Sequence, residues 1–128
     1  MQHGDIQEHG DTIYNNNRGL AYYKGSGIPQ DHHKALEWIR KAAYLGYTDA
    51  QNKLACMYQN GEAVEKSCFR ANEWYSKAVE QGYAKSQCNL GLVFYHGYGV
   101  TQSIIKAPEW LQKAADQGYS DIQYNIGL

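Results

Sequence analysis

The sequence of 128 residues lacks long apolar runs, an excess of one charge and a regular set of cysteines. No apolar stretch approaches the roughly 20 residues that a helix needs to cross a bilayer, so we expect no membrane insertion. The formal net charge is −1 and the lysines and arginines are scattered. A basic field that would hold nucleic acid is therefore not expected.

Cysteine is scarce, and the three that occur, Cys56, Cys68 and Cys88, are odd in number and follow no repeat. A disulfide framework is not expected, and a reducing compartment is the simpler interpretation. The first ten residues are polar and contain no hydrophobic region of the kind found in a signal peptide. Together these absences favour a cytoplasmic protein.

The sequence does contain a fixed period, because tryptophan recurs every 36 residues at Trp38, Trp74 and Trp110. The same step joins Gly25, Gly61 and Gly97; Lys41, Lys77 and Lys113; Gly46, Gly82 and Gly118; Tyr47, Tyr83 and Tyr119; and Gln51, Gln87 and Gln123. A period of this size marks stacked supersecondary units, each of which buries its apolar face against its neighbours. We therefore predict a repeat array and three substantially buried tryptophans.

Each unit contains two stretches with helical spacing of apolar residues. In the second unit, Leu54, Ala55 and Tyr58 share a face of the first stretch, and Ala71, Trp74 and Ala78 share a face of the second. Glycine recurs where each stretch ends, and Asp31, Ser67 and Ser103 stand where the second helices need an N-cap. The fold class is therefore all-α, built from antiparallel helix pairs.

Two further features refine this expectation. The small residues Gly19, Ala55, Gly91 and Gly127 form one column, which predicts a close approach of two helices. Pro108 lies about five residues into a predicted helix and removes a hydrogen bond, so that helix should start late or with a distorted turn.

The two ends of the array differ. At the N-terminal end, Arg18 and Asn15 replace the leucine and glutamine of later units, as expected of a flank that faces water. At the other end, Ile122, Ile126 and Leu128 would lie on the first helix of a fourth unit with no second helix to cover them. Two alternatives follow: this C-terminal edge self-associates, or the array continues into further repeats.

Three segments of the sequence show a family pattern most clearly: "LGLVFYHGYGV" from Leu90, "KALEWIRKAAYLGYTDAQ" from Lys34 and "WLQKAADQGYSDIQYNIGL" from Trp110. They resemble the Sel1-like repeat family, relatives of the tetratricopeptide repeats. The resemblance implies a right-handed α-solenoid over residues 11–128, with about three full repeats plus the first helix of a fourth, after a polar segment 1–10. It also implies a non-enzymatic scaffold whose partner is a protein or peptide.

The same resemblance implies that the first helices line a concave groove. An asparagine amide offers a donor and an acceptor to a peptide backbone, and lysines can hold a carboxylate. The expected groove residues are Asn17, Asn52, Lys53, Lys85, Asn89, Asn125, Tyr23 and Tyr95. The alternatives are that the asparagines bond only within the array and that the tyrosines cover the turn between helices.

No catalytic residue, cofactor or metal site is expected. His32 and His33 point apart as neighbours on a helix, and neither HExxH nor CxxC occurs. Besides the scaffold, two functions remain open: a structural segment of a longer array, and a hydrolase like the cysteine-rich bacterial branch of the family. The hydrolase has the least support, because no cysteine pair recurs here.

Overall fold

The computed structural model describes the backbone of residues 2–119 and the side chains of residues 11–119. The described chain is entirely helix and connecting turn, without a strand. Its six helices are α1 (Gln2–Lys24), α2 (His32–Tyr44), α3 (Thr48–Asn60), α4 (Cys68–Glu80), α5 (Ala84–His96) and α6 (Lys106–Asp116). The prediction of an all-α fold with two helices per unit is confirmed. The seventh helix expected at the C-terminal edge, with Ile122, Ile126 and Leu128, falls outside the described residues.

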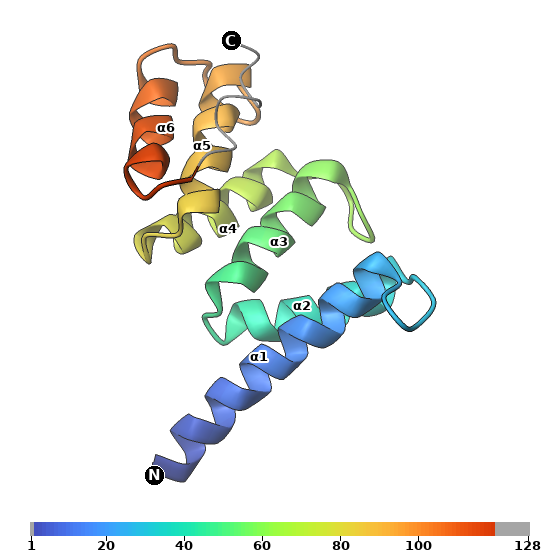
Figure 1. The fold of residues 1–128 in the computed structure, drawn as a ribbon. Coiled ribbons are helices and arrows are strands. Elements are labelled where there is room, and N and C mark those ends of the chain that lie inside the picture. Colours follow the sequence, from blue (N-terminus) through green and yellow to red (C-terminus); the bar gives the residue numbers. More distant parts are fainter. Residues whose placement is uncertain (1, 120–128) are drawn as a thin grey trace.

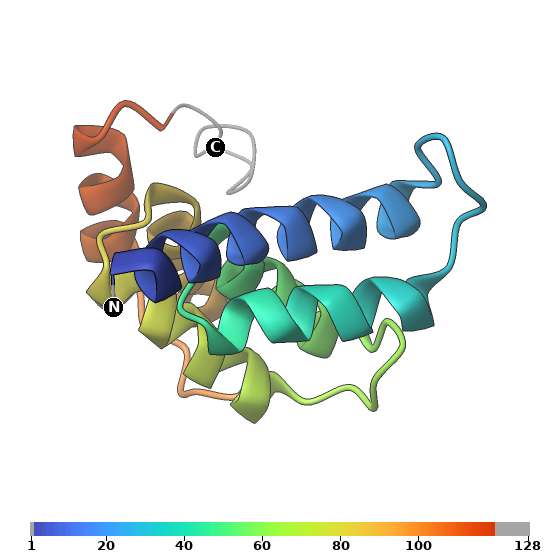
Figure 2. The same ribbon diagram turned by 90° about the horizontal axis from the view of Figure 1, so that it is seen from below.

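The helices form three pairs, α1 with α2, α3 with α4 and α5 with α6, and the pairs stack in chain order (Figure 1). Within the first pair, α1 and α2 run side by side in opposite directions (Figure 2). Successive pairs are joined by contacts of α2 with α3 and of α4 with α5. This arrangement is an α-solenoid with one helix pair per 36 residues. Because α1 begins at Gln2, it also includes most of the segment 1–10 that was expected to precede the array.

The predicted caps set the helix ends. Asp31 accepts hydrogen bonds from the backbone N–H groups of His33 and Lys34, and Ser67 accepts one from Arg70. Gly61 ends α3 in the left-handed conformation, with φ of 70°. Such caps satisfy backbone groups that a helix end would otherwise leave unpaired.

Pro108 shifts the start of the last helix, as expected. Its counterpart α4 begins at Cys68, and the equivalent position 36 residues later is Ile104, but α6 begins at Lys106. Pro108 is then the third residue of α6, where a backbone N–H has no partner within the helix in any case.

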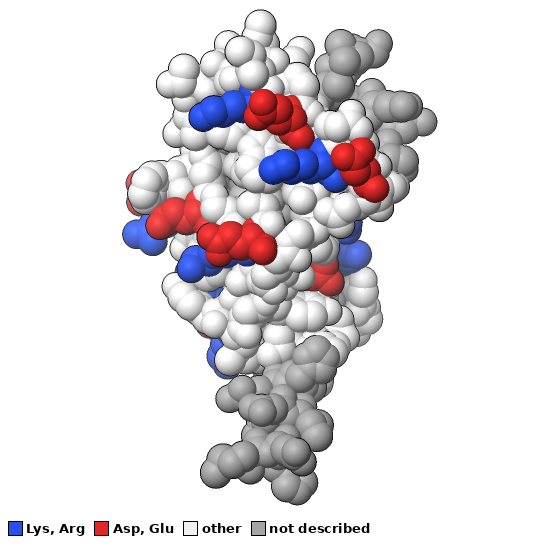
Figure 3. Space-filling view, turned by 90° about the vertical axis from the view of Figure 1, so that its left-hand side faces the viewer, with Lys and Arg blue, Asp and Glu red and all other residues white. Residues whose placement is uncertain are grey.

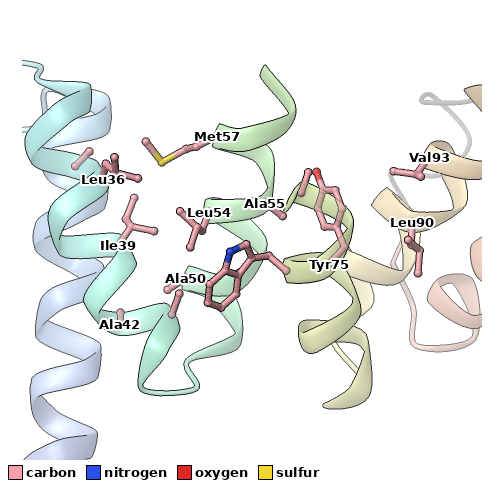
Figure 4. Packing of buried hydrophobic residues seen from close by; sticks show 14 residues of the cluster. Leu36, Ile39, Ala42, Ala50, Leu54, Ala55, Met57, Tyr75, Leu90 and Val93 are labelled. Carbon is pink, nitrogen blue, oxygen red and sulfur yellow. The ribbon is translucent and has the colours of Figure 1, made fainter. Parts of the chain in front are cut away.

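The apolar core lies between the helix layers. Leu54 and Met57 of α3 point toward Ile39 of α2, and all three are at most 1% exposed (Figure 4). The central Trp74 is buried, with 9% of its surface exposed. Trp38 and Trp110 are half-buried, so of the three predicted tryptophans the central one is the most completely buried. Only the central tryptophan has a described helix pair on both sides.

The small column allows a close approach of paired helices. A Cβ atom on Gly19 would lie 2.5 Å from Ile39 Cγ1, and one on Gly91 would lie 2.8 Å from Leu111 Cγ. Ala55 occupies the same column and is fully buried. The packing prediction is confirmed for these three positions, and Gly127 lies outside the described residues.

A pair of glutamines closes each junction between repeats, and we call this arrangement the glutamine clasp. At the first junction, Gln81 Nε2 donates to Gln51 Oε1 over 3.1 Å and to the Gly46 carbonyl over 3.3 Å. At the second, Gln117 Nε2 donates to Gln87 Oε1 over 2.7 Å and to the Gly82 carbonyl over 2.8 Å. Each amide thereby satisfies a carbonyl at the end of the preceding helix pair.

Candidate functional site

The candidate groove residues fall on α1, α3 and α5, which are the first helices of the three pairs. Asn17 and Lys85 are exposed, Lys53 and Asn89 are half-buried, and Asn52 is buried. Tyr23 and Tyr95 lie near the C-terminal ends of α1 and α5. Asn125 lies outside the described residues. The structure brings Lys53 to Tyr23 and Asn89 to Asn52, which gives two clusters, one around Lys53 and one around Asn89.

Lys53 lies at the centre of the first cluster. Its Nζ is 3.3 Å from the centre of the Tyr23 ring, a close cation–π contact that bridges α1 and α3. Desolvation lowers the pKa of Lys53, Cys56 and Glu62 act in the opposite direction, and the positive charges of Lys24 and Lys85 lower the pKa by smaller amounts. Desolvation is the largest cause of the lowered pKa, so the ammonium group is partly removed from water.

Tyr23 joins this cluster to the turn of the next repeat. Its ring stacks on His32 with centres 4.6 Å apart, and its hydroxyl donates to Glu62 Oε2 over 2.6 Å. Burial and the hydrogen bond to Glu62 raise the pKa of Tyr23 to about 12. Tyr23 therefore contacts the turn after α3, as the alternative interpretation describes. Tyr95 is 37% exposed and packs edge-on against His96.

Asn89 lies at the centre of the second cluster. Its Nδ2 donates to Asn52 Oδ1 over 3.0 Å, and Ser86 Oγ donates to the same oxygen over 2.8 Å. Asn89 Nδ2 also approaches Cys56 Sγ at 4.0 Å. Asn52 is therefore held between α3 and α5 by two residues of α5, and Asn89 remains partly accessible beside it.

The second cluster continues to the end of α3. Cys56 Sγ is 3.3 Å from the hydroxyl of Tyr75, which donates to Gln59 Oε1 over 2.6 Å. Sequence reasoning missed Ser86, Cys56 and Gln59 as polar partners. The available signal was helical spacing: Ser86 and Asn89 are three residues apart, as are Cys56 and Gln59, so each pair shares a helix face.

The described part of the first helices carries more basic than acidic side chains. Among residues of α1, α3 and α5 with described side chains, the basic ones are Arg18, Lys24, Lys53 and Lys85, and the acidic ones are Asp11 and Asp49. Asp49 accepts a hydrogen bond from the hydroxyl of Tyr83. On the side where α6 lies in Figure 1, acidic and basic side chains lie next to each other (Figure 3). The first-helix layer therefore carries a small excess of positive charge.

Within residues 11–119, no group of three or more histidine, cysteine, aspartate or glutamate side chains is placed to hold a metal ion. Cys56, Cys68 and Cys88 are free thiols. None of the described helices has the combination of length and apolar character needed to span a bilayer.

A family model described as the Sel1 repeat matches three consecutive segments, residues 13–47, 48–83 and 84–119. Each segment contains one helix pair of the solenoid. A comparison with curated protein sequences gave no significant match.

Three proteins with solved structures are among those similar to this chain. A protective antigen of uropathogenic Escherichia coli strains with an SLR fold, c5321, shares 39% identity over 87% of this chain and 24% of its own, with a TM-score of 0.81. A Sel1 repeat protein from Oxalobacter formigenes shares 32% identity over 91% of this chain and 50% of its own, with a TM-score of 0.81. Helicobacter pylori cysteine rich protein B shares 29% identity over 73% of this chain and 71% of its own, with a TM-score of 0.66.

The chain thus spans about a quarter of the length of the Escherichia coli antigen and half the length of the Oxalobacter formigenes protein. The matched repeats cover nearly all of the described residues, and the helix pairs coincide with them. The chain therefore belongs to the Sel1-repeat family, whose repeats are generally non-enzymatic and typically mediate protein–protein interactions.

Proposed function

We propose that this chain is a non-enzymatic scaffold that holds a peptide or protein segment against the first-helix layer of α1, α3 and α5. The binding surface comprises the Lys53 cluster and the Asn89 cluster. Lys53 and Asn89 occupy the same column of adjacent repeats, 36 residues apart, so an extended segment that crosses the layer meets both. Asn17 continues this column on α1.

The state of Lys53 is the observation that carries the proposal. Among the described residues, its ammonium group contacts the Tyr23 ring and makes no ion pair. The nearby carboxylate of Glu62 already accepts the hydroxyl of Tyr23. A half-buried cation without a carboxylate partner favours a partner that supplies one, because charge-assisted hydrogen bonds are stronger than neutral ones. The low pKa of Lys53 would rise when such a carboxylate binds.

Asn89 supplies the neutral part of the surface. Its amide nitrogen is used by Asn52 and Cys56, and its carbonyl oxygen makes no hydrogen bond within the described residues. That oxygen is free to accept a backbone N–H group from an extended peptide. Specificity for a carboxylate and anchoring of a backbone thus come from adjacent helices.

The test is a peptide-array screen with the purified chain, followed by fluorescence anisotropy on the tightest peptide. Lys53→Met keeps the aliphatic stem and removes the charge, and we expect binding about tenfold weaker or more, as the loss of a hydrogen bond to a charged group implies. Lys113→Met is the matched control, because Lys113 lies over the Trp110 ring at 4.4 Å in the opposite layer. The control should bind the peptide with the affinity of the wild type. Added salt should weaken the affinity of the wild type, but not below the affinity of Lys53→Met.

If no peptide binds, the scaffold proposal fails for this surface. Equal loss of affinity in Lys53→Met and Lys113→Met would mean that general charge, rather than the first-helix layer, holds the peptide.

A further inference from the structure

We propose that a small pocket at the second repeat junction receives an aromatic side chain of the bound partner. The pocket has a volume of about 140 Å³. Its lining consists of Gln59, Asn60, Lys66, Cys68 and Tyr98. This inference rests on the proposed function in one respect, that the ring is carried by a segment bound to the first-helix layer.

The molecule contains its own template for the occupant. Thirty-six residues before the lining residues stand Tyr23, Lys24, Gln30, His32 and Glu62. At that first junction the Tyr23 ring stacks on His32 at 4.6 Å, and its hydroxyl donates to Glu62 over 2.6 Å. Gln30 Nε2 donates to the carbonyl of Tyr23 over 2.9 Å. The residues that surround the Tyr23 ring thus hold the same positions as the residues that line the pocket.

The ring is missing at the second junction because Gln59 replaces tyrosine. Gln59 Oε1 accepts the hydroxyl of Tyr75 over 2.6 Å, which ties its side chain to α4. Cys68 replaces the larger His32, and the ring of Tyr98 is stacked on His96 with centres 4.9 Å apart. Three substitutions in the repeat therefore leave a space where the preceding repeat has an aromatic ring.

The walls of this space suit a ring. A thiol at Cys68 offers a soft, polarizable contact, and the Lys66 ammonium offers a cation for an aromatic face. The volume of about 140 Å³ is close to the roughly 150 Å³ of an apolar cavity that admits benzene. A phenol group, which combines an aromatic ring with a hydroxyl, therefore matches the pocket in size and suits its largely polar lining.

A chain of contacts links the pocket to the Asn89 cluster of the proposed binding surface. Hydrogen-bond and sulfur contacts run from Asn89 to Cys56, from Cys56 to Tyr75 and from Tyr75 to Gln59 in the pocket wall. The first junction shows the same relation, because Lys53, in the column of Asn89, lies against the Tyr23 ring. A segment anchored at Asn89 can therefore place a nearby aromatic side chain in the pocket.

The experiment uses p-cresol, the side chain of tyrosine, as the probe. In ¹H–¹⁵N spectra of the whole chain, millimolar p-cresol should shift the amide signals of Cys68 and Tyr98. Gln59→Tyr should restore the ring of the preceding repeat, weaken p-cresol binding at least tenfold and raise the melting temperature. Gln59→Ala loses the same hydrogen bond to Tyr75 but leaves the pocket open, so it should still bind the probe.

A reciprocal variant tests the template directly. Tyr23→Gln should open the equivalent pocket at the first junction, so p-cresol should then also shift the signals of His32 and Glu62. Absence of localised shifts at Cys68 and Tyr98 in the wild type, or undiminished binding to Gln59→Tyr, would overturn the proposal.

These outcomes are separable from the failure of the proposed function. If peptides bind in a Lys53-dependent manner while p-cresol does not bind, the scaffold proposal stands and the pocket proposal fails. If p-cresol binds at Cys68 and no peptide binds the chain, the pocket accepts aromatic rings but the scaffold proposal fails.

Discussion

Replacing Trp74 with alanine tests how burial is distributed along the solenoid. Trp74 is 9% exposed, and Tyr44 packs edge-on against its ring with centres 5.2 Å apart. A tryptophan side chain buries about 150–250 Å², which at about 25 cal/mol per Å² corresponds to roughly 4–6 kcal/mol. Because the unfolded chain already buries part of that area, we expect a loss of about 3–5 kcal/mol, which is also the usual cost of such core truncations.

The three tryptophans provide an internal comparison. Trp38 and Trp110 occupy the same column but are half-buried, so their replacement by alanine should cost less than that of Trp74. Phe69 is the control on α4, because it is 72% exposed and its replacement should change stability by less than about 0.5 kcal/mol. Each variant is unfolded in urea and followed by circular dichroism, which reports the helices directly.

The free energy of unfolding is obtained from the midpoint and the slope of each urea transition. Solenoid stability is approximately a sum over repeats and their interfaces, so loss of the more deeply buried central tryptophan should lower the unfolding midpoint more than loss of Trp110. If Trp110→Ala costs as much as Trp74→Ala, or if Trp74→Ala costs less than about 1 kcal/mol, the burial argument is refuted.

Three further predictions concern two kinds of glycine position and the buried hydroxyl of Tyr75. Gly19→Ala should destabilise the chain by about 1–2 kcal/mol in urea unfolding, because overpacking against Ile39 exceeds the roughly 1 kcal/mol gained in helix propensity; a gain in stability would contradict this. Gly27→Ala should cost about 1 kcal/mol through its φ of 79° alone, whereas Gly99→Ala should cost at least about 1 kcal/mol more, because its Cβ would lie 2.7 Å from that of Cys68; equal melting temperatures would show that this contact relaxes freely. Burial raises the pKa of Tyr75 above its unfolded value near 10, so its contribution to stability is complete below pH 10 and is lost as pH rises above it. The free energy of unfolding should therefore fall with pH by up to about 1.4 kcal/mol per pH unit, and Tyr75→Phe should reduce this dependence. An equal pH dependence of the unfolding free energy in wild type and variant between pH 9 and 11 would refute the assignment.

The helix pairs follow from the sequence because their signals are local. Cap residues such as Ser67 and Gly61 act on backbone groups within a turn, and Pro108 acts on the turn that contains it. The small column at Gly19 and Gly91 likewise needs only the spacing of the repeat to show where paired helices approach. Each of these predictions depends on geometry that all three repeats share.

Contacts between repeats were harder to predict, since they depend on which of several reachable partners a side chain selects. The column of Gln51 and Gln87 is visible in the sequence, but its partners Gln81 and Gln117 share a column with Leu45 and so show no full repeat. The partial exposure of Trp38 likewise depends on its place in the first helix pair rather than on its position within the repeat.

The candidate site shows the same division. The column of Lys53 and Asn89 was predicted on the first helices, and both residues lie there. The contact of Lys53 with Tyr23, and the burial of Asn52 beneath Ser86 and Asn89, depend on rotamers and on the separation of α1, α3 and α5. Binding by these residues remains a prediction.

The glutamine clasp has a consequence for how the length of such a chain can change. Both junctions use the same residue types, two glutamines and one glycine carbonyl, and each clasp involves only adjacent repeats. Removing residues 48–83 would bring Gly46 and Tyr47 to Ala84, Gln87 and Gln117, which are the residue types of an existing junction. We therefore expect a duplication or deletion of one 36-residue unit to keep the clasp at every junction, so that the chain can be lengthened or shortened without a new kind of contact between repeats.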